Sequence, residues 1–296
     1  MKKTPVFSLV VLALAAGFGG GWLFNAAHKT GAEAAQKTES AYERVMHTQT
    51  IRCGYVVWTP FLVKDPNSGQ LSGLFYDYVE ALGKALNLKI DWTEEVGWGD
   101  FPAALNSGKI DAMCGGSWAN STRAREIDFV QPIIYQQSFA WVREGDVRFD
   151  NNLAAINDPS VKVIFVEGST QAVIAAHDFP KATAVPLPDM TSLADTLVSL
   201  ADGKADVGLV STEAGYQYTL NNPGKVRRVL AKAPLRVFGN SIAVPGGEDR
   251  LRRMLDNSTN ELLASGQIEQ LVDAYGKVAD TWLRIAPPYD NTQAAH

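Results

Sequence analysis

The chain has 296 residues, of which 46% are hydrophobic and 20% are charged. This profile is that of an ordinary globular protein and excludes a disordered or fibrous chain. The formal net charge is -5, from 27 Lys and Arg against 32 Asp and Glu. Because the sequence contains no dense basic run, nucleic acid is not expected as a partner.

Residues 1–30 are expected to direct the chain to or through a membrane. Lys2 and Lys3 precede an uncharged stretch over residues 6–27, which is long enough to cross a bilayer as a helix. One interpretation is a cleavable signal peptide, with a small-residue cleavage site at Ala32-Glu33-Ala34. The other is an uncleaved anchor. In both, the lysines stay in the cytoplasm and the rest of the chain lies outside.

The cysteines and histidines give little sign of a metal site. Cys53 and Cys114 fall near the ends of predicted strands, and both fall in the same half of the expected fold. An exported chain can keep a disulfide, so a bridge and two separate buried thiols both stay open. The four histidines share no metal-ligand spacing with one another or with the cysteines. We predict no metal and no cofactor.

Residues 31–49 are rich in Ala, Glu and Lys and show little apolar periodicity, which predicts a solvated helical or flexible spacer. The folded body is expected to start near Ile51. Short apolar strands then alternate with amphipathic helices, and this alternation predicts a mainly parallel sheet covered by helices. The expected elements are a strand at 51–57, a helix over 75–86, a strand at 89–93, a helix at 101–106 and a strand at 110–113.

A weak internal echo predicts a second, similar α/β unit. Residues 105–113 resemble residues 200–208, and in each a helix ends at a glycine, Gly108 or Gly203, before a strand begins. Ser192 and Asp195 have the spacing of a capping box at the start of one helix. The second unit is expected to contain a strand at 161–166, a turn at Gly168, a helix from about Gln171, a helix at 193–200 and a strand at 206–210.

The last part of the chain is expected to return to the first unit. A strand at 237–244 and two helices, at 251–262 and 268–275, follow the second unit. Two chain crossings, near 137–143 and 235–240, would then form a hinge. The predicted fold is α/β with two lobes, each a mainly parallel sheet flanked by helices. The expected limits are 50–138 for the first lobe, 139–237 for the second, 238–288 for the return and 289–296 for a frayed tail.

Seven short motifs occur in one order along the chain. They are Trp58-Thr-Pro-Phe61, Gly73-Leu-Phe-Tyr-Asp77, Trp98 with Leu105-Asn-Ser-Gly-Lys-Ile-Asp111, Arg123-Ala-Arg-Glu-Ile-Asp-Phe129, Glu167-Gly-Ser-Thr-Gln171, Gly203-Lys-Ala-Asp206 and Phe238-Gly-Asn-Ser-Ile-Ala243. Together they resemble the polar amino-acid binding proteins of ABC importers, the family-3 periplasmic solute-binding proteins. The resemblance implies a type II periplasmic-binding-protein fold, a small ligand and an ABC permease as partner. It also implies a periplasmic location. The chain would be soluble there if residues 1–30 are cleaved, and tethered to the inner membrane by the N-terminal helix if they are not.

The resemblance implies a ligand site built from both lobes. Arg123 would pair with a ligand carboxylate, because a guanidinium offers two parallel donors to that group. The turn before the helix at about residue 171 would grip the same carboxylate through free backbone N–H groups and the Thr170 hydroxyl. The other residues placed in the site are Trp58, Trp98, Ser117, Trp118, Gln171, Ser211 and Glu213.

Two positions depart from the family pattern. Asn120 stands where the family has threonine, which is a mild change because an amide can still cap a helix. Ser211 stands where the family commonly has the acidic residue that binds an α-ammonium group. Without that carboxylate, a buried ammonium group would be poorly paired unless Glu213 takes its place. The expected ligand is therefore an unusual amino acid or a carboxylate without an ammonium group.

No catalytic motif is legible: the sequence has no Gly-x-Ser-x-Gly elbow and no P-loop. A binding protein rather than an enzyme is therefore the main prediction. One alternative is a dehydratase or lyase on the same scaffold, with Glu213 protonating a leaving hydroxyl while Arg123 holds a substrate carboxylate. The other alternative is a sensory ligand-binding module tethered to the membrane by an uncleaved N-terminal helix.

Overall fold

The computed structural model describes residues 39–276 and 282–285. The first elements are α2 (Ala41–Thr48), β1 (Thr50–Tyr55), β2 (Val63–Lys64), β3 (Leu71–Ser72), α3 (Leu74–Leu86), β4 (Lys89–Glu95), α4 (Phe101–Asn106), β5 (Ala112–Trp118), the 3-10 helix η1 (Arg123–Arg125), β6 (Ile127–Phe129) and β7 (Ile134–Arg143). The later elements are the 3-10 helix η2 (Leu153–Ile156), β8 (Lys162–Val166), α5 (Thr170–Asp178), β9 (Thr183–Leu187), α6 (Leu193–Ala201), β10 (Val207–Ser211), α7 (Thr212–Asn221), β11 (Val226–Arg228), β12 (Arg236–Pro245), α8 (Asp249–Ala264), α9 (Gln267–Tyr275) and β13 (Trp282–Arg284).

The predicted membrane segment at 1–30 and the predicted tail at 289–296 lie outside the described residues. Within the part that is described, no helix is both long and apolar enough to cross a membrane.

The main sheet joins parallel strands at its two ends through antiparallel strands at its centre. Its order is β4-β1-β5-β12-β7-β10-β8-β9. Strand β1 pairs in parallel with β4 and β5, and β8 pairs in parallel with β9 and β10. Helices follow most of these strands, as the alternation in the sequence predicts. The α/β class is therefore confirmed.

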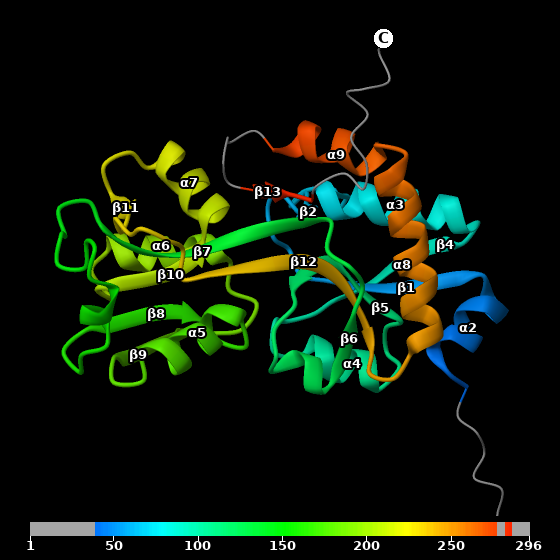
Figure 1. Cartoon of the computed structure of the whole chain (residues 1–296), viewed down its shortest axis with the longest axis horizontal. Helices are drawn as coiled ribbons and strands as arrows, with labels where there is room; N and C mark the ends of the chain where they lie inside the picture. Colours follow the sequence, from blue (N-terminus) through cyan, green and yellow to red (C-terminus); the bar gives the residue numbers. More distant parts are fainter. Residues whose placement is uncertain (1–38, 277–281, 286–296) are drawn as a thin grey trace, which may run out of the picture. The chain divides into compact units, whose positions relative to one another are not determined.

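Strands β7 and β12 connect two groups of elements that lie on either side of them (Figure 1). They pair antiparallel, with Ser138 opposite Arg236 and Ile134 opposite Asn240. We define the first lobe as α2, β1–β6, α3, α4, α8 and α9. The second lobe is β8–β11 and α5–α7. The chain thus crosses twice between the lobes, through two strands that are hydrogen-bonded neighbours.

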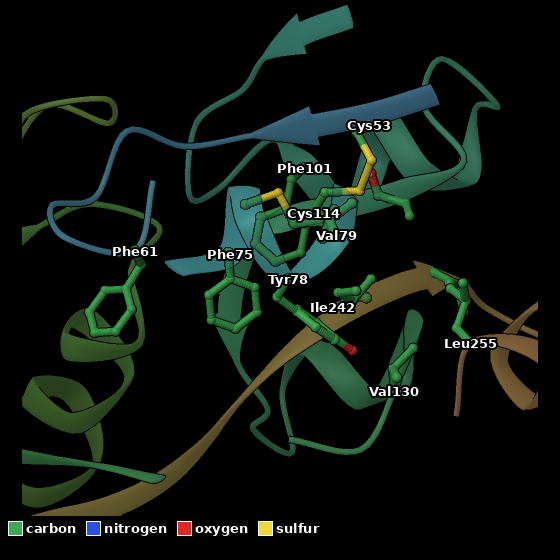
Figure 2. Packing of buried hydrophobic residues seen from close by; sticks show 14 of the residues in the cluster. Cys53, Phe61, Phe75, Tyr78, Val79, Phe101, Cys114, Val130, Ile242 and Leu255 are labelled. Atoms are coloured by element: carbon green, nitrogen blue, oxygen red, sulfur yellow. A yellow bond between two sulfur atoms is a disulfide. The ribbon is translucent and has the colours of Figure 1, made fainter. Parts of the chain in front are cut away.

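The first lobe has a continuous apolar core that includes Phe75 and Tyr78 of α3 and Leu255 of α8. Figure 2 shows these side chains beside the disulfide that joins Cys53 of β1 to Cys114 of β5. Of the two alternatives left open by the sequence, the bridge is the one present. It lies inside the core, where both cysteines are buried.

Residues 31–38 of the predicted spacer lie outside the described residues. Over residues 41–48 the chain is helical, which was one of the two expectations, but helix α2 packs against the first lobe rather than being solvated. Its Ala41 and Val45 are buried in the first-lobe core. Arg44 of the same helix forms an ion pair with buried Asp111, and the Ala41 N–H donates to the Glu248 carboxylate at 2.6 Å. Two apolar residues are too few to produce a visible periodicity, so the sequence did not reveal this packing. The folded body begins at about Ala41 rather than near Ile51.

The residues predicted to begin and end individual helices are confirmed. Gly108 and Gly203 have left-handed φ values of 73° and 77°, so each ends its helix as expected. Ser192 caps α6, because its hydroxyl accepts a hydrogen bond from the Asp195 N–H at 3.3 Å. Ser169 and Ser211 cap α5 and α7 in the same way. Three serine-capped helix starts therefore follow the strands of the second lobe.

Candidate functional site

A small cavity brings together residues from both lobes. Its volume is about 10 Å³, enough for about one water molecule. It is lined by Trp58, Trp98, Trp118, Arg123, Thr170, Gln171 and Leu193. The first four come from the first lobe and the last three from the second. Six of the residues that the sequence placed in the site therefore meet at one point.

The strand directions explain why these distant residues converge. Trp118 is the last residue of β5, while Trp58 and Trp98 follow the ends of the parallel strands β1 and β4. In the second lobe, Thr170 and Gln171 begin helix α5, which follows the end of the parallel strand β8. Carboxyl ends of parallel strands share one edge of a sheet, and ligands of open α/β sheets bind at that edge.

The three tryptophans form a packed aromatic wall. The ring centroids of Trp58 and Trp98 are 5.3 Å apart, those of Trp58 and Trp118 are 5.8 Å apart, and both pairs meet edge to face. Trp118 also stacks on Phe238 of β12 at 5.0 Å. All three tryptophans are buried. The wall is therefore supported by Phe238 of β12, and an aromatic contact is what it offers to a ligand.

Arg123 lies in this cavity with its guanidinium bonded to both lobes. Its Nη1 donates to Ser117 Oγ at 3.0 Å and to Thr170 Oγ1 at 3.4 Å. Its Nη2 donates to the backbone carbonyls of Trp98 at 3.0 Å and Gly168 at 3.1 Å. Four of the five donors of a guanidinium are thereby engaged. A carboxylate that binds Arg123 through two parallel donors must replace at least one of these acceptors.

The charge of Arg123 survives its burial. Desolvation lowers the pKa of Arg123 to about 10, and the carboxylate of Asp189 opposes that lowering. The guanidinium carbon also lies 4.6 Å from the ring centroid of Phe101, in a cation–π contact. Since the pKa stays above neutrality, the cavity contains a permanent positive charge.

Neighbouring residues at the start of α5 have different roles: Ser169 caps the helix and Thr170 faces the first lobe. Ser169 caps the helix by accepting from the Ala172 N–H at 3.3 Å. Thr170 accepts a hydrogen bond from the Asn120 side chain at 3.2 Å. The Asn120 side chain also accepts from the Arg123 N–H at 3.0 Å, although the N-cap position of η1 itself is Thr122.

Ser211 and Glu213 are not among the residues that line the cavity. They stand at the start of α7, where Ser211 is fully buried and accepts from the Ala214 N–H at 3.2 Å. Glu213 is only 2% exposed, and neither of its carboxylate oxygens receives a hydrogen bond from the described residues. Burial raises the pKa of Glu213 to about 8, and the neighbouring Ser211 hydroxyl, which is not within hydrogen-bond geometry of the carboxylate, offsets only part of that rise. Glu213 is therefore mostly protonated at neutral pH.

Two residues near the cavity, Leu193 and Asp189, were not predicted from the sequence to belong to the site. Leu193, the first residue of α6, lines the cavity. Asp189 follows β9 in the second lobe and accepts hydrogen bonds from the backbone N–H groups of Trp98 and Gly99 in the first lobe. In the sequence, only its position just after a strand could have marked Asp189, and that strand, β9, was not predicted. Among the described residues, no group of His, Cys, Asp and Glu side chains is arranged to hold a metal ion.

The family model named bacterial extracellular solute-binding proteins, family 3, matches residues 51–278 of this chain. The chain belongs to this family. The match covers both lobes apart from α2, together with both crossing strands, and it confirms the resemblance drawn from the seven motifs. The family description places its members outside the cytoplasm.

Relatives and solved structures agree with the family. A probable histidine-binding protein of Neisseria gonorrhoeae is 23% identical over 222 residues, which is 74% of this chain and 79% of the relative. The crystal structure of an ancestral amino acid-binding protein, described as a precursor of cyclohexadienyl dehydratase, has a TM-score of 0.69 and 23% identity. It covers 80% of this chain and 100% of that structure. A histidine kinase sensor domain with similarity to periplasmic binding proteins has a TM-score of 0.68 at 21% identity, covering 80% and 98%. These likenesses confirm the periplasmic-binding-protein fold.

Proposed function

We propose that this chain captures a small carboxylate-bearing ligand, an amino acid or a related organic acid, by closure of its two lobes. The observation that supports this most directly is Arg123, a buried cation whose hydrogen-bond partners come from both lobes. A carboxylate that took over some of these donors would be held by a charge-assisted, bidentate contact. Binding without turnover is part of the proposal.

Lobe closure follows from the proposed position of the ligand carboxylate, at Arg123 between the two lobes. A cavity of about 10 Å³ is too small for an amino acid, so the lobes must separate to admit one. The hinge is proposed at β7 and β12, where the chain crosses between the lobes. A ligand that contacts Arg123 on one side and Thr170 on the other binds the closed form better and shifts the population toward it. An ABC permease in the membrane is the proposed recipient of the ligand.

A ligand screen on the full-length chain tests the role of Arg123. Amino acids, dicarboxylates and keto acids are ranked by the rise in melting temperature that each produces. Arg123→Ala is expected to weaken binding of the best hit by roughly 100-fold, because it removes a buried charged donor. Arg125→Ala is the matched control, since Arg125 is exposed in the same 3-10 helix. Equal affinity of Arg123→Ala and wild type would show that the site is elsewhere, and a hit that is consumed would show turnover.

Proton release distinguishes an amino acid from an organic acid without an ammonium group. Ser211 supplies no charge, so Glu213 is the nearest carboxyl group along the chain that an ammonium group could ionise. Because Glu213 is mostly protonated at neutral pH, pairing with an ammonium group is expected to release close to one proton per ligand. Calorimetry in two buffers of different ionisation enthalpy measures that number. Release that persists in Glu213→Gln would exclude this carboxyl group as the source.

A further inference from the structure

The loop at residues 97–99 of the first lobe holds a carboxylate that belongs to the second lobe. The carboxylate of Asp189 accepts hydrogen bonds from the Trp98 N–H at 2.8 Å and from the Gly99 N–H at 2.9 Å, one on each oxygen. The first of these oxygens also accepts from the N–H of Met190 at 2.9 Å. Backbone donors aimed at a carboxylate form strong, directional contacts.

Glycines shape this loop around the carboxylate. A Cβ atom on Gly97 would clash with Oδ2 of Asp189, and one on Gly99 would lie 3.1 Å from the same oxygen. Gly97 does not have a positive φ, so a side chain there would be excluded by the carboxylate rather than by the backbone. The loop therefore fits the carboxylate because it lacks a side chain at Gly97, and the contact at Gly99 is tight.

Charge adds to these hydrogen bonds. Asp189 is the negative group whose field opposes the loss of charge on buried Arg123. Arg123 in turn donates to the Gly168 carbonyl of the second lobe. The carboxylate from one lobe and the guanidinium from the other therefore connect the lobes without any ligand atom.

We propose that Asp189 is a closure latch, a residue that holds the second lobe against the first and so sets the balance between open and closed forms. The latch breaks when the lobes separate, because its acceptor and its donors lie on different lobes. Apparent affinity scales with the fraction of binding-competent molecules, so the latch tunes affinity without contacting the ligand. This inference rests on the proposed lobe movement but not on the identity of the ligand.

Amide hydrogen exchange on the full-length chain, with no ligand added, tests the latch directly. The Trp98 and Gly99 amides are expected to be protected in the wild type and to exchange about tenfold faster or more in Asp189→Ala. Gly97→Ala is expected to have the same effect, since it displaces the carboxylate without altering Asp189. Asp202→Ala is the matched control, because it removes an exposed carboxylate from the same lobe.

Asp189→Ala and Gly97→Ala are expected to act through the same contact, that between the Asp189 carboxylate and the loop at 97–99. In the double variant, exchange at Trp98 and Gly99 is expected to be no faster than in either single variant. Additive acceleration, or unchanged exchange in either single variant, overturns the latch. Amides of α3 and β5 report folding, and Asp189→Asn replaces Asp189→Ala if those amides also lose protection. A failed ligand screen would leave these exchange results intact, so the two proposals fail separately.

Discussion

Raising the pH from about 5 to about 9 is expected to destabilise the wild-type chain by on the order of 4 kcal/mol relative to Glu213→Gln. The pKa of Glu213 is raised to about 8 in the folded state by burial, against an ordinary value of 4.5. Between those two values the folded state holds a proton that the unfolded state releases. The stability linked to this proton is fully present below the unfolded pKa and is lost as the pH rises through the folded pKa.

Urea unfolding of both proteins at several pH values measures this difference. Glutamine has the shape of the protonated acid and cannot ionise, so the variant keeps the packing and loses the pH dependence of this one group. Glu261→Gln is the matched control, because Glu261 is an exposed glutamate on α8. If wild type and Glu213→Gln follow parallel pH profiles, Glu213 ionises in contact with water, and its buried position is wrong.

Loss of the disulfide is expected to lower the free energy of unfolding by about 4 kcal/mol. Cys53 and Cys114 are 61 residues apart, so the bond closes a long loop in the unfolded chain and removes much of its conformational freedom. The paired substitution Cys53→Ala with Cys114→Ala keeps small apolar groups in the core and removes the link together with its two buried sulfur atoms. Denaturant unfolding of the variant against the oxidised wild type gives the difference.

A reducing agent supplies the control for that experiment. Reduction is expected to bring the wild type down to the stability of the paired variant and to leave the variant unchanged. Equal stability of oxidised wild type and paired variant would mean that the bridge forms no constraint on the unfolded chain, or that it does not form.

The sequence predicted the elements well where their signals are local. Apolar periodicity placed α3 and α4, and glycines placed the ends of helices before β5 and β10. The packing of helix α2 was missed because its burial depends on two residues and on charged partners, Asp111 and Glu248, that are distant in the sequence. Strand β9 was missed as well, and its edge position leaves it with little apolar pattern.

The site was predicted in part, and the limits have a physical cause. Six cavity residues were identified because family motifs mark the ends of parallel strands. Asp189 was missed because its partners are backbone N–H groups of the other lobe, and no side-chain pattern records such a contact. The four hydrogen bonds of Arg123 also depend on how the two lobes meet, and local sequence patterns do not reveal that arrangement.

The double crossing at β7 and β12 makes the first lobe discontinuous along the chain. Its core needs α8 and α9, which come after the whole second lobe has been made. A chain that leaves the cytoplasm N-terminus first therefore exposes an incomplete apolar surface until its last helices emerge. Both cysteines precede the second lobe in the sequence. Their bond can therefore join β1 to β5 before α8 and α9 are present to bury the apolar surface.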